Sequence, residues 1–213
     1  TAPGKAIVLE IGIHGIPVTM PQSVYDNLLA GALNNYWDTN IDNPDKNYYK
    51  RVVTGAVRGV DYIASLSQWD GKTIGVTGAS QGGFLSLAVA ALDKRITFLG
   101  VVHDAMCDYS AEVHGVAGGW PHYFYKNTDK SLKVKVDASM YYDGVNFARR
   151  INVPGWYSFG YNDEVVPPTS SYGLYNIVTA PKKLSVYQQT GHYWYQEQWD
   201  EWQNYIKEHL NVK

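Results

Sequence analysis

The sequence predicts an α/β fold in which a mostly parallel sheet is flanked by helices. Short β-rich segments alternate with stretches that repeat apolar residues at helical spacing. Hydrophobic residues make up 45% of the 213 residues, which is enough apolar material for the core of one large domain. A glycine-rich turn, GASQGG at residues 78–83, lies between a predicted strand and a predicted helix, an arrangement typical of α/β sheets.

Each predicted element follows from its local pattern. Short, largely apolar runs predict strands at residues 6–13, 73–77, 96–102, 155–159 and 183–187. Apolar residues at helical spacing predict helices over residues 52–64, 84–92 and 195–210, the last of them packed against the sheet. Residues 14–48 are rich in turn formers and predict loops.

Residues 107–150 predict a segment of another kind. Their glycines and the Trp120–Pro121 pair favour irregular or short helical structure. We therefore expect a cap-like excursion outside the sheet, within a single α/β domain that spans residues 1–213.

Composition excludes several classes of function. Eighteen Lys and Arg against 20 Asp and Glu give a net charge of −2, so we expect neither nucleic acid nor a membrane surface as a partner. No apolar run approaches the roughly 18 residues of a membrane span. The single cysteine, Cys107, excludes thiolate metal clusters, and the sequence has neither HExxH nor GxxxxGK[ST]. We therefore expect no metal and no cofactor.

The turn at residues 78–82 is the strongest indication of chemistry. Its pattern, Gly78-x-Ser80-x-Gly82 between a strand and a helix, is that of a nucleophile elbow. Small residues are expected because a side chain at Gly78 or Gly82 would collide with the neighbouring chain. The strained turn would point the Ser80 hydroxyl outward, and the helix would direct its first amides at a developing negative charge.

Two other interpretations of this turn are weaker. It could be a glycine-rich turn with an exposed serine, or the phosphate-binding turn of a short-chain dehydrogenase. The dehydrogenase pattern requires a glycine where this chain has Phe84, and a tyrosine followed four residues later by lysine, which the chain lacks.

A serine nucleophile needs a base, and the base needs an orienting acid. In a parallel sheet both should follow strands at their carboxyl ends. Asp163 follows the penultimate predicted strand and His192 follows the last one, in the chain order of an α/β-hydrolase. Asp104 and Glu164 are alternative acids, and Asp163 could be only a turn former.

Five further histidines compete with His192 for the role of base. His14 follows the first predicted strand, and His103 follows a buried strand, where we interpret it as a core histidine. His114 and His122 lie in the excursion, and His209 lies in the last helix as a surface residue.

Together these residues resemble carbohydrate esterase family 7, the acetyl xylan esterases and cephalosporin C deacetylases. The family's elbow is GxSQG, which residues 78–82 match in full. VRGVDYIASL at residues 57–66, with WDG at 69–71, is similar to the helix and turn before that elbow. DEVVPPTS at residues 163–170 is similar to the family's acid loop with its Pro-Pro pair, and the similarity continues to His192.

The resemblance implies a serine esterase that removes O-acetyl groups from xylan, xylo-oligosaccharides or other small acetyl esters through an acyl-enzyme. By position in the motifs, Ser80 would be the nucleophile, Asp163 the orienting acid and His192 the general base. The backbone N–H of Gln81 would supply one oxyanion donor. Members of the family often form compact oligomers, so the resemblance implies a homo-oligomer as one option.

The sequence departs from the family at two places. Tyr193 stands where the family often has Glu, and HGI at residues 14–16 stands where it has Arg-Gly-Gln. A second oxyanion donor should come from the loop after an earlier strand, for which His14-Gly15 is a candidate. No further strand is evident between Gly15 and Thr73. We therefore expect residues 6–13 to be the strand after the oxyanion strand, and the chain to lack about the first third of a complete family member.

Three alternatives stay open at this point: a truncated or degenerate hydrolase domain with little activity, a serine peptidase with the same triad, and a carbohydrate-binding module that seven Trp and 18 Tyr would suit. The compartment also stays open. A polysaccharide substrate favours the periplasm or secretion, small acetylated oligosaccharides could be processed inside the cell, and one free cysteine is compatible with either.

Overall fold

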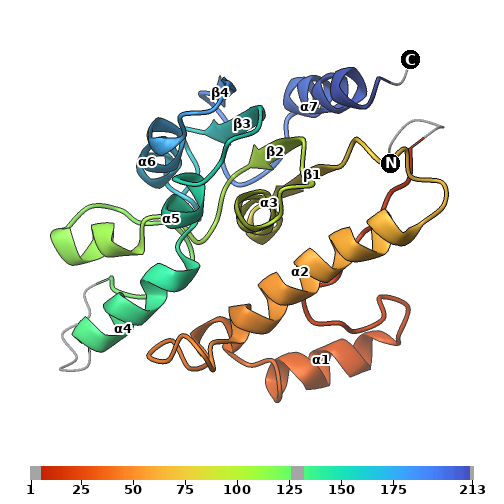
Figure 1. Cartoon of the computed structure of the whole chain (residues 1–213). Helices are drawn as coiled ribbons and strands as arrows, with labels where there is room; N and C mark the ends of the chain where they lie inside the picture. The colour runs from red at the N-terminus through yellow and green to blue at the C-terminus, as the bar shows by residue number, and fades with distance from the viewer. Residues whose placement is uncertain (1–5, 126–131, 212–213) are drawn as a thin grey trace.

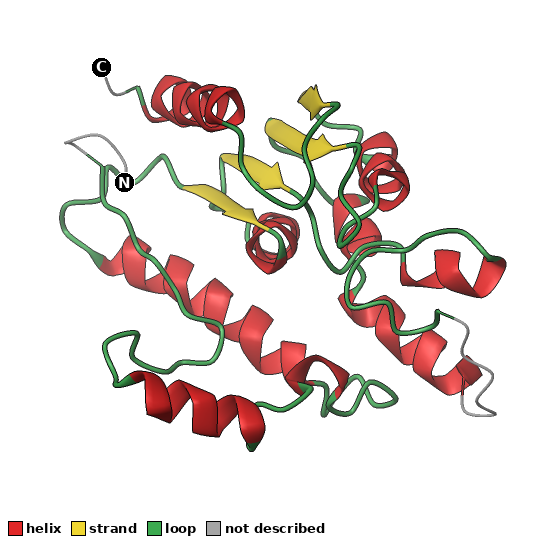
Figure 2. Cartoon of the chain, turned by 180° about the vertical axis from the view of Figure 1, so that it is seen from behind, coloured by secondary structure: helices red, strands yellow, loops and turns green. Residues whose placement is uncertain are grey.

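The computed structural model describes residues 6–125 and 132–211. Four strands form one sheet in chain order: β1 (Gly75–Ala79), β2 (Phe98–Val102), β3 (Gly155–Gly160) and β4 (Lys182–Tyr187). Every neighbouring pair is parallel, so the carboxyl ends of all four strands lie at one edge of the sheet (Figure 2). The predicted parallel α/β sheet is therefore confirmed.

Helices cover both faces of this sheet. Helix α3 (Gln81–Leu92) packs on β1 and β2 from one side, and α7 (Gln196–Leu210) packs on β1, β2 and β3 from the other (Figure 1). Residues 83–90 of α3 are all buried, because this helix lies between the sheet and two further helices, α2 (Tyr48–Ser65) and α5 (Gly144–Ala148). Its sequence is accordingly apolar on all sides, as expected for a core helix.

Helix α2 (Tyr48–Ser65) confirms the periodicity seen in the sequence. Its buried face includes Val52, Ala56 and Val60, and it packs against α3. The side chain of Asn47 accepts a hydrogen bond from the backbone N–H of Tyr49 and so caps the first turn.

Helix α1 (Gln22–Ala30) was not predicted, because residues 14–48 were expected to form loops. It lies beyond α2 at the periphery (Figure 1). None of its nine residues is buried, no side chain caps its first turn and no acidic residue lies in that turn, so the usual start signals of a helix are missing. A 3-10 turn, η1 (Tyr36–Asp38), follows it and buries Tyr36.

The predicted first strand, residues 6–13, is wrong. This segment is extended or turned but pairs with no described strand, and Ile7, Val8 and Ile11 are 41%, 52% and 47% exposed. Leu9 lies close to Gly59 of α2 instead. An apolar run becomes a strand only when its N–H and C=O groups pair with those of a neighbouring strand. This segment lies beside α2 instead and does not pair with the open edge of β1.

Short helices connect β2 to β3, in agreement with the irregular or short helical structure predicted there. They are η2 (Tyr109–His114), α4 (Leu132–Ser139), η3 (Met140–Tyr142) and α5 (Gly144–Ala148); residues 126–131 lie outside the described residues. Helix α5 packs on α3 and on α6 (Pro168–Ile177). The interpretation of this segment as a cap, and the single-domain organisation, stay predictions. Among the described residues, no helix combines the length and apolar character that crossing a membrane requires.

Candidate active site

The turn between β1 and α3 holds Ser80 in a strained backbone conformation. Its φ is +57° and its ψ −122°, a region that non-glycine residues rarely adopt. Hydrogen bonds on both sides keep it there: the Ser80 N–H donates to the Val102 carbonyl at 2.9 Å, and the Ser80 carbonyl accepts from the Phe84 N–H at 3.1 Å. The turn predicted as a nucleophile elbow thus has the strand, the strained serine and the helix that such an elbow requires.

The two glycines of the turn are not equivalent. A Cβ on Gly78 would lie 2.4 Å from the backbone carbonyl carbon and oxygen of Gly82, so no side chain fits there. A Cβ on Gly82 would meet nothing within 4 Å, so the predicted collision at Gly82 is wrong. The close approach of the strand end to the helix start requires only one of the two positions to lack a side chain.

The structure brings Ser80, Asp163 and His192 together. The Nε2 atom of His192 is 3.0 Å from Oγ of Ser80, and its Nδ1 atom is 2.8 Å from Oδ2 of Asp163. Ser80 follows β1, Asp163 follows β3 and His192 follows β4, so the common direction of the parallel strands delivers all three to one edge of the sheet.

The carboxylate of Asp163 is buried and fully engaged. Its Oδ1 atom accepts hydrogen bonds from the backbone N–H groups of Val165 and Val166, at 3.0 and 2.8 Å. Burial alone would raise the pKa of Asp163, but the contacts with His103 and His192 and the Val166 amide outweigh it and hold the pKa well below its usual range. The group is therefore an anion throughout the neutral range.

The orientation of His192 determines what it can do. A carboxylate only accepts hydrogen bonds, so Nδ1, which faces Asp163, carries the ring proton. The Nε2 atom of the neutral ring then offers a lone pair to the Ser80 hydroxyl. The three groups are arranged for transfer of the serine proton to the imidazole while the carboxylate stabilises the resulting charge.

Gln81 follows Ser80 and is the first residue of α3. No helical carbonyl precedes its backbone N–H by one turn, so that N–H is left for another acceptor. The Gln81 side chain does not accept from this N–H. Its Oε1 atom instead accepts hydrogen bonds from the hydroxyls of Tyr36 and Tyr49, at 3.1 and 2.9 Å. These two tyrosines lay in segments to which the sequence assigned no function.

His103 is a member of this cluster that the sequence reasoning placed only in the core. It lies directly after β2, and its Nδ1 atom is 3.2 Å from the same Oδ2 of Asp163. The rule that identified Asp163 and His192, a polar residue at the carboxyl end of a parallel strand, applies to His103 as well. Among the described residues, His103, Asp163 and His192 are also the set whose donor atoms could hold a metal ion, all within 4.8 Å of one another. Their direct contacts of 2.8 and 3.2 Å are those of a hydrogen-bonded and charge-paired network.

The other candidates lie apart from this arrangement. His122 pairs with Glu112 at 2.9 Å, and the hydrogen bond to that carboxylate raises the pKa of His122. His14 is 2.7 Å from the hydroxyl of Tyr48. Of the alternative acids, Glu164 is exposed, and Asp104 is buried with a pKa that burial raises to about 6.

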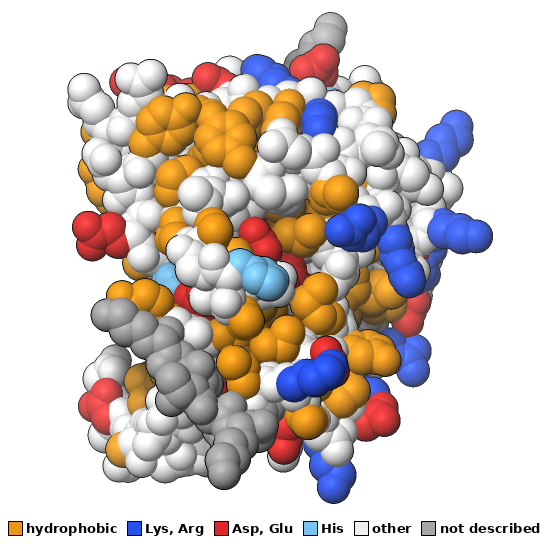
Figure 3. Space-filling view, turned by 90° about the vertical axis from the view of Figure 1, so that its left-hand side faces the viewer, with side chains coloured by type: hydrophobic (Ala, Val, Ile, Leu, Met, Phe, Trp, Pro, Cys, Tyr) orange, Lys and Arg blue, Asp and Glu red, His pale blue; other side chains and the backbone are white. Residues whose placement is uncertain are grey.

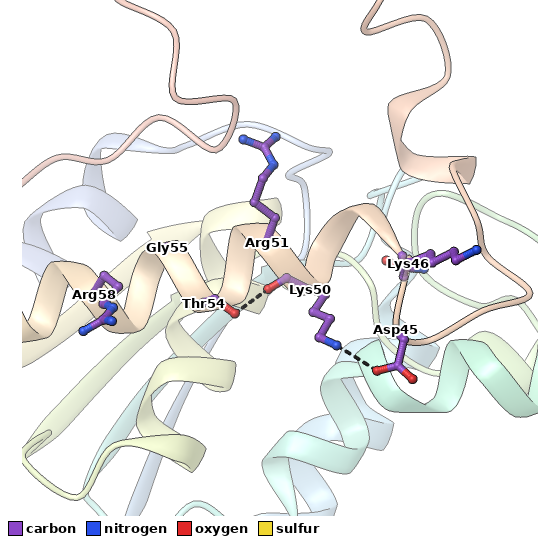
Figure 4. A pocket seen from close by; sticks show the side chains of 8 residues that line it. Asp45, Lys46, Lys50, Arg51, Thr54, Gly55 and Arg58 are labelled. Atoms are coloured by element: carbon purple, nitrogen blue, oxygen red, sulfur yellow. Dashed lines mark hydrogen bonds and ion pairs between the residues drawn. The ribbon is translucent and has the colours of Figure 1, made fainter.

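One face of the molecule is mixed in character. On the face shown in Figure 3, histidine side chains lie beside acidic ones near the centre, with hydrophobic side chains above and below them. A shallow depression on α2 is separate and basic (Figure 4). Lys50 there pairs with Asp45 at 2.7 Å, Arg51 points away from both, and none of Ser80, Asp163 and His192 lines it.

Comparison with known proteins gives consistent relatives. The model of the acetyl xylan esterase (AXE1) family matches residues 32–209. The acetyl esterase Axe7A of Xylanibacter ruminicola is 42% identical over 179 residues, which cover 83% of this chain and 40% of that protein.

Solved structures agree with this result. An acetyl xylan esterase from Paenibacillus sp. R4 superposes with a TM-score of 0.77 at 28% identity, over 83% of this chain and 58% of that one. Acetyl xylan esterase 1 from Thermoanaerobacterium sp. JW/SL YS485 gives a TM-score of 0.73 at 24% identity, over 83% of this chain and 58% of that one. An acylaminoacyl peptidase from Pyrococcus horikoshii gives a TM-score of 0.63 at 12% identity, over 78% of this chain and 29% of that one. These last two show the fold alone. The chain thus spans 40% of the length of the curated relative and 58% of that of the two esterase structures.

Proposed function

Because this chain belongs to the acetyl xylan esterase family, we propose that it is a serine esterase that removes O-acetyl groups from acetylated xylan, xylo-oligosaccharides or similar small acetyl esters. The observation that carries the proposal is the continuous contact from Ser80 Oγ through His192 to Asp163, at 3.0 and 2.8 Å. This is the geometry that activates a serine hydroxyl, which at neutral pH is a poor nucleophile on its own.

The first half of the reaction forms an acyl-enzyme. His192 Nε2 takes the proton of the Ser80 hydroxyl as Oγ attacks the acetyl carbonyl carbon, and the carbonyl oxygen becomes an oxyanion. The tetrahedral intermediate then collapses. The bond to the sugar oxygen breaks, His192 returns the proton to that oxygen, and the acetyl group stays on Ser80 as an ester.

The second half releases acetate. Water enters, gives a proton to His192 Nε2 and attacks the acetyl carbon. The second tetrahedral intermediate breaks the bond to Ser80 Oγ, which recovers the proton from His192. Asp163 stays an anion in both halves and stabilises the imidazolium without accepting its proton.

Stabilisation of the oxyanion is assigned to the backbone N–H of Gln81. It begins α3, so it lacks a helical acceptor and lies at the positive end of the helix dipole. The bonds of the Gln81 side chain to Tyr36 and Tyr49 support this role, because they fix the residue whose amide must point at the substrate. A preorganised donor of this kind is worth roughly 10²- to 10³-fold in kcat.

The test is acetate release from p-nitrophenyl acetate and from acetylated xylo-oligosaccharide. Ser80→Ala is expected to lower kcat/KM by at least about 10³-fold on both substrates, the scale seen when a triad nucleophile is removed. Ser67→Ala, at an exposed serine in the loop between α2 and β1, is the matched control and should leave the rate unchanged.

Each outcome separates the alternatives. Release that Ser80→Ala does not change overturns the proposal. A folded chain without activity on either substrate favours the truncated or degenerate domain. Cleavage of peptide substrates in place of acetyl esters favours the peptidase. A preference for polymeric acetylated xylan over short oligosaccharides would support a site of action outside the cytoplasm.

A further inference from the structure

His103 lies at the end of β2 in a conformation that directs its ring into the site. Its φ is +47°, and its N–H donates to the Ser158 carbonyl at 2.9 Å, so the residue is anchored to β3. The side chain is only 2% exposed. A left-handed, buried, non-glycine residue is costly, and such positions persist where the surroundings or the function require them.

Both ring nitrogens of His103 face oxygen atoms that only accept. The Nε2 atom is 3.1 Å from the backbone carbonyl oxygen of Tyr193, and the Nδ1 atom is 3.2 Å from Oδ2 of Asp163. The contact at Nδ1 has the distance of an ion pair without the alignment of a hydrogen bond. A neutral imidazole carries one proton, so one of its lone pairs would face one of these oxygens. Only the imidazolium, with a proton on each nitrogen, is attracted to both.

The charges around His103 favour this form. Asp163, from the loop after β3, provides the nearest anion, and Asp104 is the adjacent residue of the chain. His192, from the loop after β4, faces it with ring centroids 5.3 Å apart. The ordinary state of His192 before reaction is neutral, because it must accept the serine proton. Asp163 therefore holds two histidines through one carboxylate oxygen.

We propose that His103 is a positioning residue of the active site: as an imidazolium it ties the Asp163 carboxylate to the backbone of Tyr193, next to His192, and its charge keeps His192 neutral at lower pH. This inference rests on the proposed esterase function. The first effect fixes the loop that carries the base, because Tyr193 is the next residue after His192. The second follows from Coulomb repulsion, since protonating His192 would place two positive rings side by side.

The charge effect gives the sharpest test. His103→Asn keeps a donor near Asp163 and tolerates a left-handed conformation, but it cannot carry a positive charge. We expect the acidic limb of the kcat/KM–pH profile on p-nitrophenyl acetate to move to higher pH by roughly 0.6 to 2.4 pH units. This is the range for two unit charges about 5 Å apart, between the dielectric constant of water and an effective value of 20.

Matched variants distinguish this proposal from a merely structural role and from failure of the esterase proposal. His114→Gln, at an exposed histidine, should leave the profile where it is in the unaltered protein. A His103→Asn protein with lower kcat but an unmoved acidic limb overturns the charge proposal while Ser80-dependent release still stands. If Ser80→Ala does not reduce release, the esterase proposal fails and this one fails with it.

If His103→Asn does not fold, the protonation state of His103 can be measured directly by ¹⁵N NMR. In ¹⁵N-labelled Ser80→Ala protein, both imidazole nitrogens of His103 should have the chemical shifts of an imidazolium at pH 7. The His103 resonances can be assigned by comparison with the Ser80→Ala/His103→Asn double variant, which lacks them. A shift pattern with one unprotonated nitrogen on His103 would contradict the proposal.

Discussion

The backbone N–H of Ser80 donates a 2.9 Å hydrogen bond to the carbonyl oxygen of Val102, which joins the strained turn after β1 to the last residue of β2. His103 is the next residue of the chain, directly after β2. Ser80 and His103 are therefore positioned by the same strand end, and a change in the register of β2 would displace both.

The acid of the site is expected to be Asp163. Asp163→Asn keeps the shape of the side chain, but its amide group would donate where His192 also donates, which favours the wrong tautomer of the imidazole. We expect kcat to fall by about 10⁴-fold, the effect of the same change in a serine protease triad. Steady-state hydrolysis of p-nitrophenyl acetate measures it.

The neighbouring carboxylate is the matched control for that change. Glu164 is exposed and forms none of the triad contacts described above, so Glu164→Gln should leave kcat within about twofold of the original value. A larger loss for Glu164→Gln than for Asp163→Asn would reassign the acid.

The two glycines of the elbow should respond differently to alanine. Gly78→Ala forces a Cβ to within 2.4 Å of the Gly82 backbone, so the turn must move and activity should be lost together with stability. Gly82→Ala has free space around its Cβ and lies within α3, where alanine is the better helix former by about 0.5–1 kcal/mol. Thermal unfolding and esterase assays measure stability and activity in both variants. Equal losses in Gly78→Ala and Gly82→Ala would contradict this prediction.

The side chain of Gln81 is expected to matter for stability more than for chemistry. Gln81→Ala retains the backbone N–H assigned to the oxyanion but removes the acceptor shared by the hydroxyls of Tyr36 and Tyr49. We expect the free energy of unfolding to fall by about 1–3 kcal/mol and kcat to fall by less than about tenfold. Denaturant titration and steady-state kinetics measure the two; a 10³-fold loss of kcat in a folded protein would assign the side chain a direct catalytic role.

Asp104 should make stability depend on pH. Burial raises its pKa to about 6, and Oδ2 has no hydrogen-bond partner among the described residues. Because the folded-state pKa lies above the unfolded one, this group favours folding below about pH 4, and that contribution is lost as the pH rises to about 6. Asp104→Asn should therefore stabilise the protein more at pH 8 than at pH 4, by up to about 3 kcal/mol. Urea denaturation at the two pH values measures the difference.

Asp143 is the control for that experiment. Burial also raises its pKa to about 6, but its oxygens accept hydrogen bonds from the backbone N–H groups of Asp108, Tyr109 and Val145. An asparagine cannot accept all three, so Asp143→Asn should destabilise the protein by about 1–3 kcal/mol at pH 4. At pH 8 the loss should be smaller, because the variant also removes the carboxylate whose pKa burial raises. Equal responses at the two positions would mean that burial alone, and not hydrogen bonding, sets the outcome.

Local patterns were enough to predict much of this fold and site. Strands β2 and β3 were recognised from their apolar runs, and α2 was recognised from apolar residues at helical spacing. Asp163 and His192 were found because their place after a strand is a property of parallel sheets in general.

What the sequence did not predict depends on contacts between distant segments. The apolar residues 6–13 look like a strand, but strand formation also needs a partner edge. The role of His103 depends on Asp163 and Tyr193, which arrive from two other loops. The fit at Gly82 depends on the angle at which α3 leaves the turn, which a sequence pattern does not specify.

The arrangement of the strands also has a consequence during synthesis on the ribosome. Ser80 and His192 are 112 residues apart, and the base arrives with the last strand of the sheet. A growing chain would present Ser80 long before its partner exists, and an unpaired serine hydroxyl is almost inert toward esters. Reactivity is thus withheld until β4 has been made and docked. If Ser80 is the nucleophile proposed above, the order of translation protects it from premature acylation.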